Sequence, residues 1–114
     1  MPFIFHSDGN LFQVMDDLIN CGINALHPIE PNAMDAAILK KEYGKNICII
    51  GNINLDILSR GSIKEIEKLT LSRLEKLWDY GGYCPGSSNS IANYVPLENY
   101  NAMLRSIQYF RERL

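Results

Sequence analysis

The stretch ICIIGNIN, residues 47–54, decides the fold, because an apolar run here ends on a glycine and two amides. Four apolar residues in a row, three of them isoleucine, are typical of a strand that is buried on both faces. Such strands occur in parallel sheets covered by helices. The run predicts a strand at residues 47–50 and a loop at residues 51–61.

The same order, a short apolar run and then a helical pattern, recurs on both sides of this stretch. Further strands are predicted at residues 3–5, 23–26 and 82–84, and helices at residues 11–21, 33–43, 62–80 and 96–113. Ser62 and Glu65 form a capping box that begins the third helix. Gly22, Gly44 and Gly81 follow three of the helices, as C-terminal glycines do. Four βα units with parallel strands and right-handed crossovers result.

Four βα units allow two architectures within one domain, residues 1–114. One is a small open doubly wound sheet, and the other is half of an eight-stranded (β/α)₈ barrel. In both, ligands bind at the carboxyl ends of the strands. No GxGxxG or GxxxxGK[ST] motif follows a strand, which argues against the nucleotide-binding forms. The pattern does not choose between the two architectures.

Composition excludes several classes of protein. A net charge of −2 gives no basic surface for nucleic acid. The apolar runs are too short to cross a membrane, and the N-terminus lacks the pattern of a signal peptide. Three scattered cysteines without a CxxC motif indicate reduced thiols in the cytoplasm.

Polar side chains gather where the predicted strands end, and the candidate site residues there are His6, Asp8, Asn10, Glu30, Asn52, Asn54, Cys84, Ser87, Ser88 and Asn89. His6 and Asp8 point the same way as alternate residues, as an acid–base pair or two metal ligands would. The alternative is that residues 8–10 form the turn and N-cap of the first helix. His27 precedes a proline, which predicts a loop residue.

Each of the later candidates also has two interpretations. Asn52 and Asn54 line a pocket or cap the next turn. The small residues at 86–90 either cradle an anion with their backbone N–H groups or form a surface loop. Cys84 is either a nucleophile or zinc ligand, or a buried structural cysteine.

These segments resemble a known family. FIFHSDGN, the stretch from GINALHPIEP to IIGNIN, LSRGSIKEIEK and YCPGSSNSIANYVPLENYNAM are together similar to the C-terminal part of the uroporphyrinogen decarboxylase family. That family includes porphyrinogen decarboxylases and corrinoid-dependent methyltransferases. Its members are (β/α)₈ barrels roughly three times this length. The resemblance therefore implies the C-terminal half of a TIM-type barrel.

The resemblance also implies a zinc site and shows where this chain departs from it. In the methyltransferases a His-x-Cys pair and a cysteine after Pro-Gly bind zinc, which activates a thiol. His6 matches the histidine, but Asp8 and Ser87 stand where the two cysteines would be. Oxygen in place of two soft ligands argues against zinc held by thiolates. A harder site of His6 and Asp8 with Glu30 or Cys84 is the remaining zinc hypothesis.

In the decarboxylases a catalytic histidine lies near the position of Ser87, and the arginines for substrate carboxylates lie in the N-terminal half. We therefore expect an enzyme part in which His6 and Asp8 are catalytic and the other strand-end residues bind substrate. The implied substrate is a tetrapyrrole or a methyl donor or acceptor. The implied partner is another copy or an N-terminal half. The alternative is a non-catalytic half-barrel that requires one of these partners.

Overall fold

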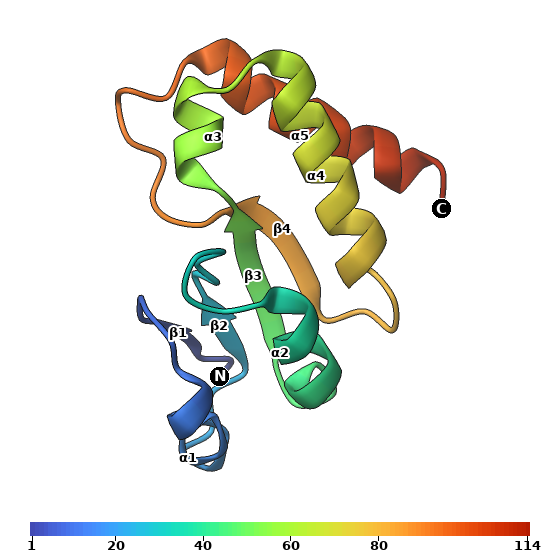
Figure 1. The fold of residues 1–114 in the computed structure, drawn as a ribbon. Coiled ribbons are helices and arrows are strands. Elements are labelled where there is room, and N and C mark those ends of the chain that lie inside the picture. The colour runs from blue at the N-terminus through green and yellow to red at the C-terminus, as the bar shows by residue number, and fades with distance from the viewer.

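A computed structural model describes residues 1–114 and contains one sheet of four strands. All neighbouring strands are parallel, and they lie in chain order (Figure 1). The strands are β1 (Ile4–His6), β2 (Ala25–His27), β3 (Cys48–Ile53) and β4 (Tyr83–Ser87). The prediction of four parallel strands is confirmed.

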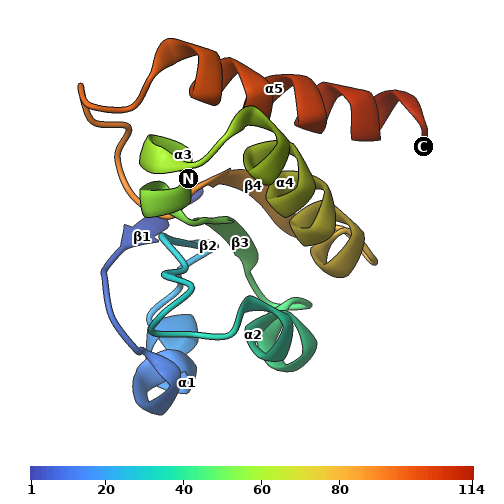
Figure 2. The same cartoon turned by 45° about the horizontal axis from the view of Figure 1, so that its top comes forward.

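The strand order decides between the two architectures that the sequence allowed. A doubly wound sheet changes direction at a switch point, so its strands do not follow chain order from edge to edge. Here the order is β1-β2-β3-β4, as it is around a barrel. Figure 2 shows α1, α2, α4 and α5 following one another around one side of the sheet. The chain therefore has the topology of half a (β/α)₈ barrel.

The helices connect these strands and cover one face of the sheet. They are η1 (Phe12–Val14, a 3₁₀ helix), α1 (Met15–Asn20), α2 (Ala36–Tyr43), α3 (Leu55–Arg60), α4 (Ile63–Leu77) and α5 (Leu97–Glu112). The predicted capping box is confirmed, because Ser62 accepts from the Glu65 N–H and Glu65 accepts from the Ser62 N–H. None of the helices is both long and apolar enough to cross a membrane.

The segment after β3 differs most from the prediction of a loop at residues 51–61. β3 continues to Ile53, because Gly51 and Asn52 still pair with β4. They do so although their φ angles are positive, at 103° and 75°. A short helix, α3, then follows. Asn54 caps it by accepting hydrogen bonds from the Asp56 and Ile57 N–H groups. Six residues are too few for helical periodicity to show in a sequence.

Other boundaries also move. The helix predicted at residues 11–21 is divided into η1 and α1, and the helix predicted from residue 33 begins after its N-cap, Asp35. The helix predicted to reach residue 80 ends at Leu77. β4 extends past residue 84 to Ser87, so Ser87 lies in a strand and not in a loop.

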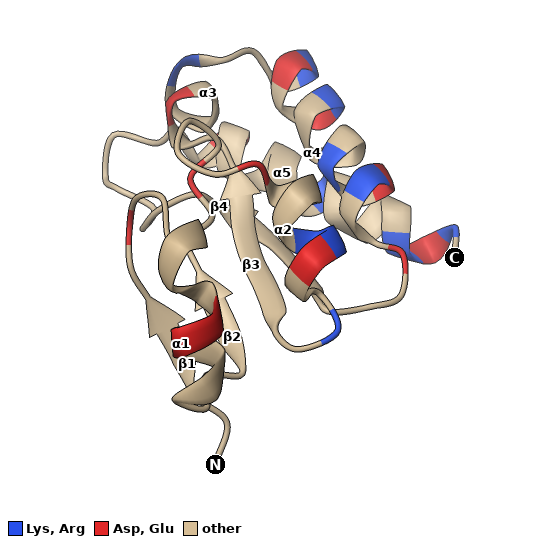
Figure 3. Cartoon of the chain, turned by 60° about the horizontal axis from the view of Figure 1, so that its bottom comes forward, with Lys and Arg blue, Asp and Glu red and all other residues tan.

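The two faces of the sheet are different. Phe5, Leu26, Ile49 and Tyr83 form one register row across the strands, and Leu26 and Ile49 are fully buried against the helices. The next row is His6, His27, Ile50 and Cys84, which lies on the other face, where His6 and Cys84 are exposed. Figure 3 shows that Lys, Arg, Asp and Glu lie on the helices and loops. No strand residue carries any of these four side chains.

Candidate functional site

Two histidines meet at the carboxyl ends of β1 and β2. His6 and His27 occupy the same register position on these strands. Their Nδ1 atoms are 2.9 Å apart, a hydrogen-bond distance, and the ring centroids are 4.9 Å apart with a tilt of 55°. Because the rings share one bond, one Nδ1 donates a proton and the other accepts it.

His27 is the more enclosed of the two rings. Burial and the neighbouring His6 lower the pKa of His27, against smaller opposing effects from the Ser87 carbonyl and Asp8. A Cβ at Gly51 would lie 2.8 Å from the Ser87 carbonyl oxygen and 3.5 Å from His27 Cδ2. A side chain at residue 51 would therefore meet both the Ser87 carbonyl and the His27 ring.

Two carboxyl groups lie next to the histidine pair. Asp8 follows β1 and Glu30 follows β2, and the two share a hydrogen bond. Burial first, and then the hydrogen bond and negative charge of Asp8, raise the pKa of Glu30. The negative charge of Asp8 therefore disfavours ionisation of Glu30. The negative charge of Asp8 also favours protonation of His27.

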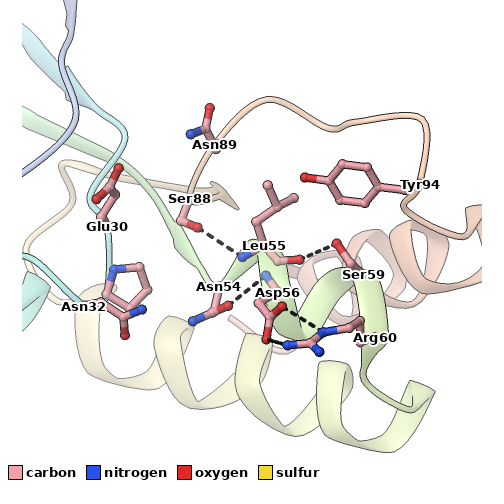
Figure 4. Close-up of a pocket in the computed structure, with 11 residues that line it drawn as sticks. Glu30, Asn32, Asn54, Leu55, Asp56, Ser59, Arg60, Ser88, Asn89 and Tyr94 are labelled. Carbon is pink, nitrogen blue, oxygen red and sulfur yellow. Dashed lines mark hydrogen bonds and ion pairs between the residues drawn. The ribbon is translucent and has the colours of Figure 1, made fainter.

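A cleft of about 490 Å³ opens beside Glu30, between the segment after β2, helix α3 and the loop after β4. Figure 4 shows Glu30 and Asn32 on one side of it and Asp56, Arg60 and Tyr94 on the other. Four predicted site residues line this cleft: Glu30, Asn54, Ser88 and Asn89. Glu30 therefore connects the histidine and carboxyl groups to the cleft.

One ion pair lies in the wall of the cleft. Arg60 Nη2 is 2.6 Å from Asp56 Oδ2, and Arg60 Nε donates to Asp56 Oδ1 at 2.8 Å. The Arg60 hydrogen bond lowers the pKa of Asp56. Both side chains are largely exposed, so the pair adds little stability. Arg60 is the only cation that lines the cleft.

Three predicted site residues have structural contacts. Asn10 accepts a hydrogen bond from the Phe12 N–H in the turn before η1. Asn52 is buried and donates to the Ile29 carbonyl at 3.0 Å, which ties β3 to the segment after β2. Ser87 is buried and accepts from the Asn89 N–H. None of the three lines the cleft.

Cys84 lies apart from the cleft. It is exposed on the face of the sheet that no helix covers, with Ile50 as its register partner. The interpretation of a buried structural cysteine is therefore wrong for Cys84 in this chain.

Sequence reasoning missed His27 and part of the cleft. The following proline had predicted a loop residue at position 27. In the structure His27 is the last residue of β2. The signal was present, because a histidine one residue past each of two adjacent strands would meet if the strands pair in register. The other missed lining residues are Pro31, Asn32, Leu55, Asp56, Ser59, Arg60 and Tyr94, several of them on the unpredicted helix α3.

The donor set for a metal differs from that of a thiolate zinc site. Asp8 and Ser87 replace the thiols, and no three His, Cys, Asp or Glu side chains gather where they could hold a metal ion together. The residues therefore do not fit zinc held by thiolates. Zinc on His6 and Asp8 with Glu30 or Cys84 stays a prediction that elemental analysis of purified protein would test.

Comparisons with known proteins bear on the whole chain. A family model described as "Uroporphyrinogen decarboxylase (URO-D)" matches residues 1–110. No curated protein matches the chain. Among solved structures, a methyltransferase from Methanosarcina mazei is similar, with 25% sequence identity and a TM-score of 0.77. The match covers 96% of this chain and 32% of the methyltransferase, so the chain spans about a third of that protein's length.

Proposed function

Because the chain belongs to the uroporphyrinogen decarboxylase family, we propose that it forms the C-terminal part of a decarboxylase- or methyltransferase-like enzyme. Its active site lies at the carboxyl ends of β1 to β4. The observation that carries this proposal is the histidine pair, His6 and His27, beside the Asp8–Glu30 carboxyl pair. Four titratable groups at one end of a parallel sheet are suited to moving protons at a bound substrate.

In this proposal His6 is the group that exchanges a proton with the substrate. Its ring is exposed on the uncovered face of the sheet, and one nitrogen remains free after Nδ1 has bonded to His27. Asp8 is its partner, because a carboxylate nearby stabilises the imidazolium that forms when a histidine takes a proton. Such a site protonates carbon after loss of CO₂, or accepts the proton of a methyl acceptor.

The cleft supplies the substrate-binding side of the proposal. Its amides and hydroxyls, from Asn32, Asn54, Ser88 and Asn89, provide hydrogen-bond donors and acceptors. Arg60, which Asp56 holds through its Nε and Nη2 groups, offers its remaining N–H groups to a substrate carboxylate. A tetrapyrrole or a methyl donor or acceptor is the class of substrate that we propose.

Substitution of His6 and Asp8 in the complete barrel tests the catalytic proposal. His6→Ala is expected to lower CO₂ release from a porphyrinogen, or methyl transfer to a thiol, by about 10²–10⁴-fold. Asp8→Ala is expected to lower the same activity by less. Cys21→Ser is the control, because Cys21 is exposed at the C-cap of α1, away from the strand ends. Full activity in both His6→Ala and Asp8→Ala would refute the assignment.

The uncovered face of the sheet supports a second proposal, that the chain functions only with a partner. Ile4 is 59% exposed and Cys84 is exposed on this face, whereas strands of a parallel sheet are normally covered on both sides. We propose that a second copy, or an N-terminal half of the barrel, covers it. Three free cysteines support a reducing compartment, the cytoplasm, for this assembly.

Sedimentation tests the need for a partner. The 114-residue chain is expected to associate with itself or with four preceding βα units, at concentrations where an unrelated domain of this size is monomeric. An Ile50→Lys variant places a charge on the uncovered face and is expected to weaken association. A well-behaved monomer at high concentration, with or without the N-terminal half present, would contradict the half-barrel proposal.

A further inference from the structure

A second cavity lies between the C-terminal ends of α2 and α4, apart from the cleft at the strand ends. Its volume is about 610 Å³, and its lining residues are Ala37, Lys40, Lys41, Gly44, Lys45, Lys76, Asp79 and Tyr80. These residues come just before β3 and β4 in the chain, so the cavity is at the amino ends of these strands. In a barrel the active site occupies the other end of the strands. A ligand in this cavity therefore has a site separate from the proposed active site.

The cavity concentrates positive charge. Four of the six lysines of the chain line it, and Asp79 is its only acidic residue. Figure 3 shows basic residues on α2, on the turn after it and on α4. None of the four lysines forms an ion pair, since the ion pair of the structure joins Arg60 to Asp56. The chain as a whole has a net charge of −2, so the excess of positive charge is local to the cavity.

The helix ends account for part of this charge but not for all of it. Lys40 and Lys41 lie in the last turn of α2 and Lys76 in the last turn of α4, where cations are favourable. Each helix C-terminus carries about half a negative charge, so the two ends and Asp79 together offset about two of the lysines. About two positive charges are left. Their mutual repulsion is relieved by an anion of similar charge.

One of the four ammonium groups is held in place. Lys40 is partly buried, and its Nζ donates a hydrogen bond to the Gly81 carbonyl. A Cβ at Gly82 would lie 3.5 Å from the same Nζ and 3.1 Å from the Gly44 carbonyl oxygen. Gly82 therefore allows the turn before β4 to approach Lys40 closely. An ammonium group that is already ordered loses less side-chain entropy when it binds an anion.

An aromatic ring accompanies the lysines. Tyr80 lines the cavity and is fully exposed. Its backbone has a φ of 64°, which is uncommon for a residue other than glycine and places it in the left-handed region. An exposed aromatic side chain beside basic groups is suited to stacking on a nucleobase whose phosphates the basic groups bind.

We propose that this cavity binds a chain of phosphate groups, either free polyphosphate or the phosphates of a nucleotide. Such an anion carries at least the two negative charges that the cavity lacks, and its oxygens accept hydrogen bonds from ammonium groups. A volume of about 610 Å³ is in the range of small-molecule sites. Tyr80 distinguishes the two sources, because only a nucleotide has a base that stacks on its ring.

Calorimetric titration of the 114-residue chain with tripolyphosphate tests the proposal. Binding is expected at low salt, and it is expected to weaken as salt screens the lysines. Lys41→Gln/Lys45→Gln removes two exposed charges and is expected to weaken binding by about 4–25-fold, at about 2–5-fold for each charge. Lys40 is left unaltered in this variant because of its bond to the Gly81 carbonyl.

A matched control separates the cavity from the general charge of the chain. Lys64→Gln/Lys68→Gln removes the same charge from the exposed first half of α4, outside the cavity, and is expected to change the affinity by less than about twofold. Far-UV circular dichroism confirms that both variants keep their helices. No binding by the unaltered chain, or equal losses in the two variants, would overturn the proposal.

ATP in place of tripolyphosphate distinguishes the two sources of phosphate. Tighter binding of ATP that Tyr80→Ala reduces to the level of tripolyphosphate assigns the site to a nucleotide. Equal affinities that Tyr80→Ala leaves unchanged assign it to free polyphosphate, and either result supports the proposal. Adenosine is the probe without phosphates. If adenosine bound as tightly as ATP, the phosphates would contribute nothing and the proposal would be overturned.

Discussion

The two faces of the sheet carry neighbouring register rows with opposite environments. On the helix-covered face, Leu26 and Ile49 are fully buried. One residue further along the same strands, His27 is half-buried and Ile50 partly exposed, and His6 and Cys84 at the two edges are exposed. A shift of one residue therefore separates the core from the candidate site, as the two-residue period of a strand requires.

The two faces of the half-barrel sheet therefore have different roles, stability on one and the candidate site on the other. The covered face supplies the stability of the isolated chain, because its apolar side chains are already removed from water. The other face carries the histidines and a thiol, together with isoleucines that no helix covers. In a complete barrel, layers of side chains fill this interior. Predictions that treat the two faces separately test this division.

The largest expected effect is on the covered face. Leu26→Ala removes a side chain with 0% exposure, which is expected to lower the free energy of unfolding by about 2–5 kcal/mol. Ile50→Ala on the other face is expected to cost about 1 kcal/mol or less in the isolated chain. Urea denaturation of both variants measures the difference. Equal losses would show that the second face is also packed in the isolated chain.

The next effect lies at Gly51, where β3 takes a positive φ angle. Gly51→Ala places a Cβ 2.8 Å from the Ser87 carbonyl oxygen at a φ of 103°, which is expected to cost about 1–3 kcal/mol. Gly86→Ala is the matched control on the neighbouring strand, because a Cβ there meets nothing within 4 Å and φ is not positive. It is expected to stabilise by about 0.4–1 kcal/mol in the same urea titration. A harmless Gly51→Ala would contradict the close approach of residue 51 to the Ser87 carbonyl oxygen.

The sequence predicted what short-range signals encode. Ser62 and Glu65 are three residues apart, so the start of α4 could be read directly. The four βα units followed from the alternation of apolar runs and helical patterns, and the resemblance supplied the half-barrel. The strand-end position of His6, Glu30 and Ser88 followed from the same pattern.

What the sequence did not predict depends on contacts between distant residues. The His6–His27 pair requires the register of β1 on β2, which strand pairing over 21 residues sets. Asn52 was predicted either to line a pocket or to cap the next turn, whereas in the structure it is buried and donates to the distant Ile29 carbonyl. Helix α3 has a cap at Asn54 but too few residues for a periodic pattern, so the cleft wall that it forms was missed.

A smaller effect is expected at the one hydroxyl of the covered row. Tyr83 is buried and its hydroxyl donates to the Gly51 carbonyl at 3.0 Å, which ties β4 to β3. Tyr83→Phe is expected to cost about 0.5–1.5 kcal/mol, since the carbonyl loses its donor. Tyr80→Phe is the control, because Tyr80 is fully exposed, and it is expected to change stability by less than about 0.5 kcal/mol. Thermal unfolding of both variants gives the comparison, and equal changes would show that the hydrogen bond of the Tyr83 hydroxyl does not stabilise the fold.

The smallest effect is a pH dependence that arises on the uncovered face. Burial and His6 lower the pKa of His27 below its ordinary value of 6.5, so the unfolded chain takes up a proton at His27 before the folded chain does. The contribution of His27 to stability is therefore present above pH 6.5 and is lost as the pH falls from 6.5 through the folded pKa. Glu30, whose pKa is raised from 4.5, acts in the opposite direction, because its contribution is present below pH 4.5 and is lost as the pH rises through the folded pKa.

Urea titrations at pH 7.5 and 5.5 of the unaltered chain and His27→Asn isolate the histidine, since Glu30 is common to both. The unaltered chain is expected to lose more stability between these values than the variant does. An assembled barrel that buries the histidine pair more deeply is expected to enlarge the difference. Equal losses in the unaltered chain and the variant would mean that His27 is as solvated as a free histidine, and that the pair does not belong to an interior layer.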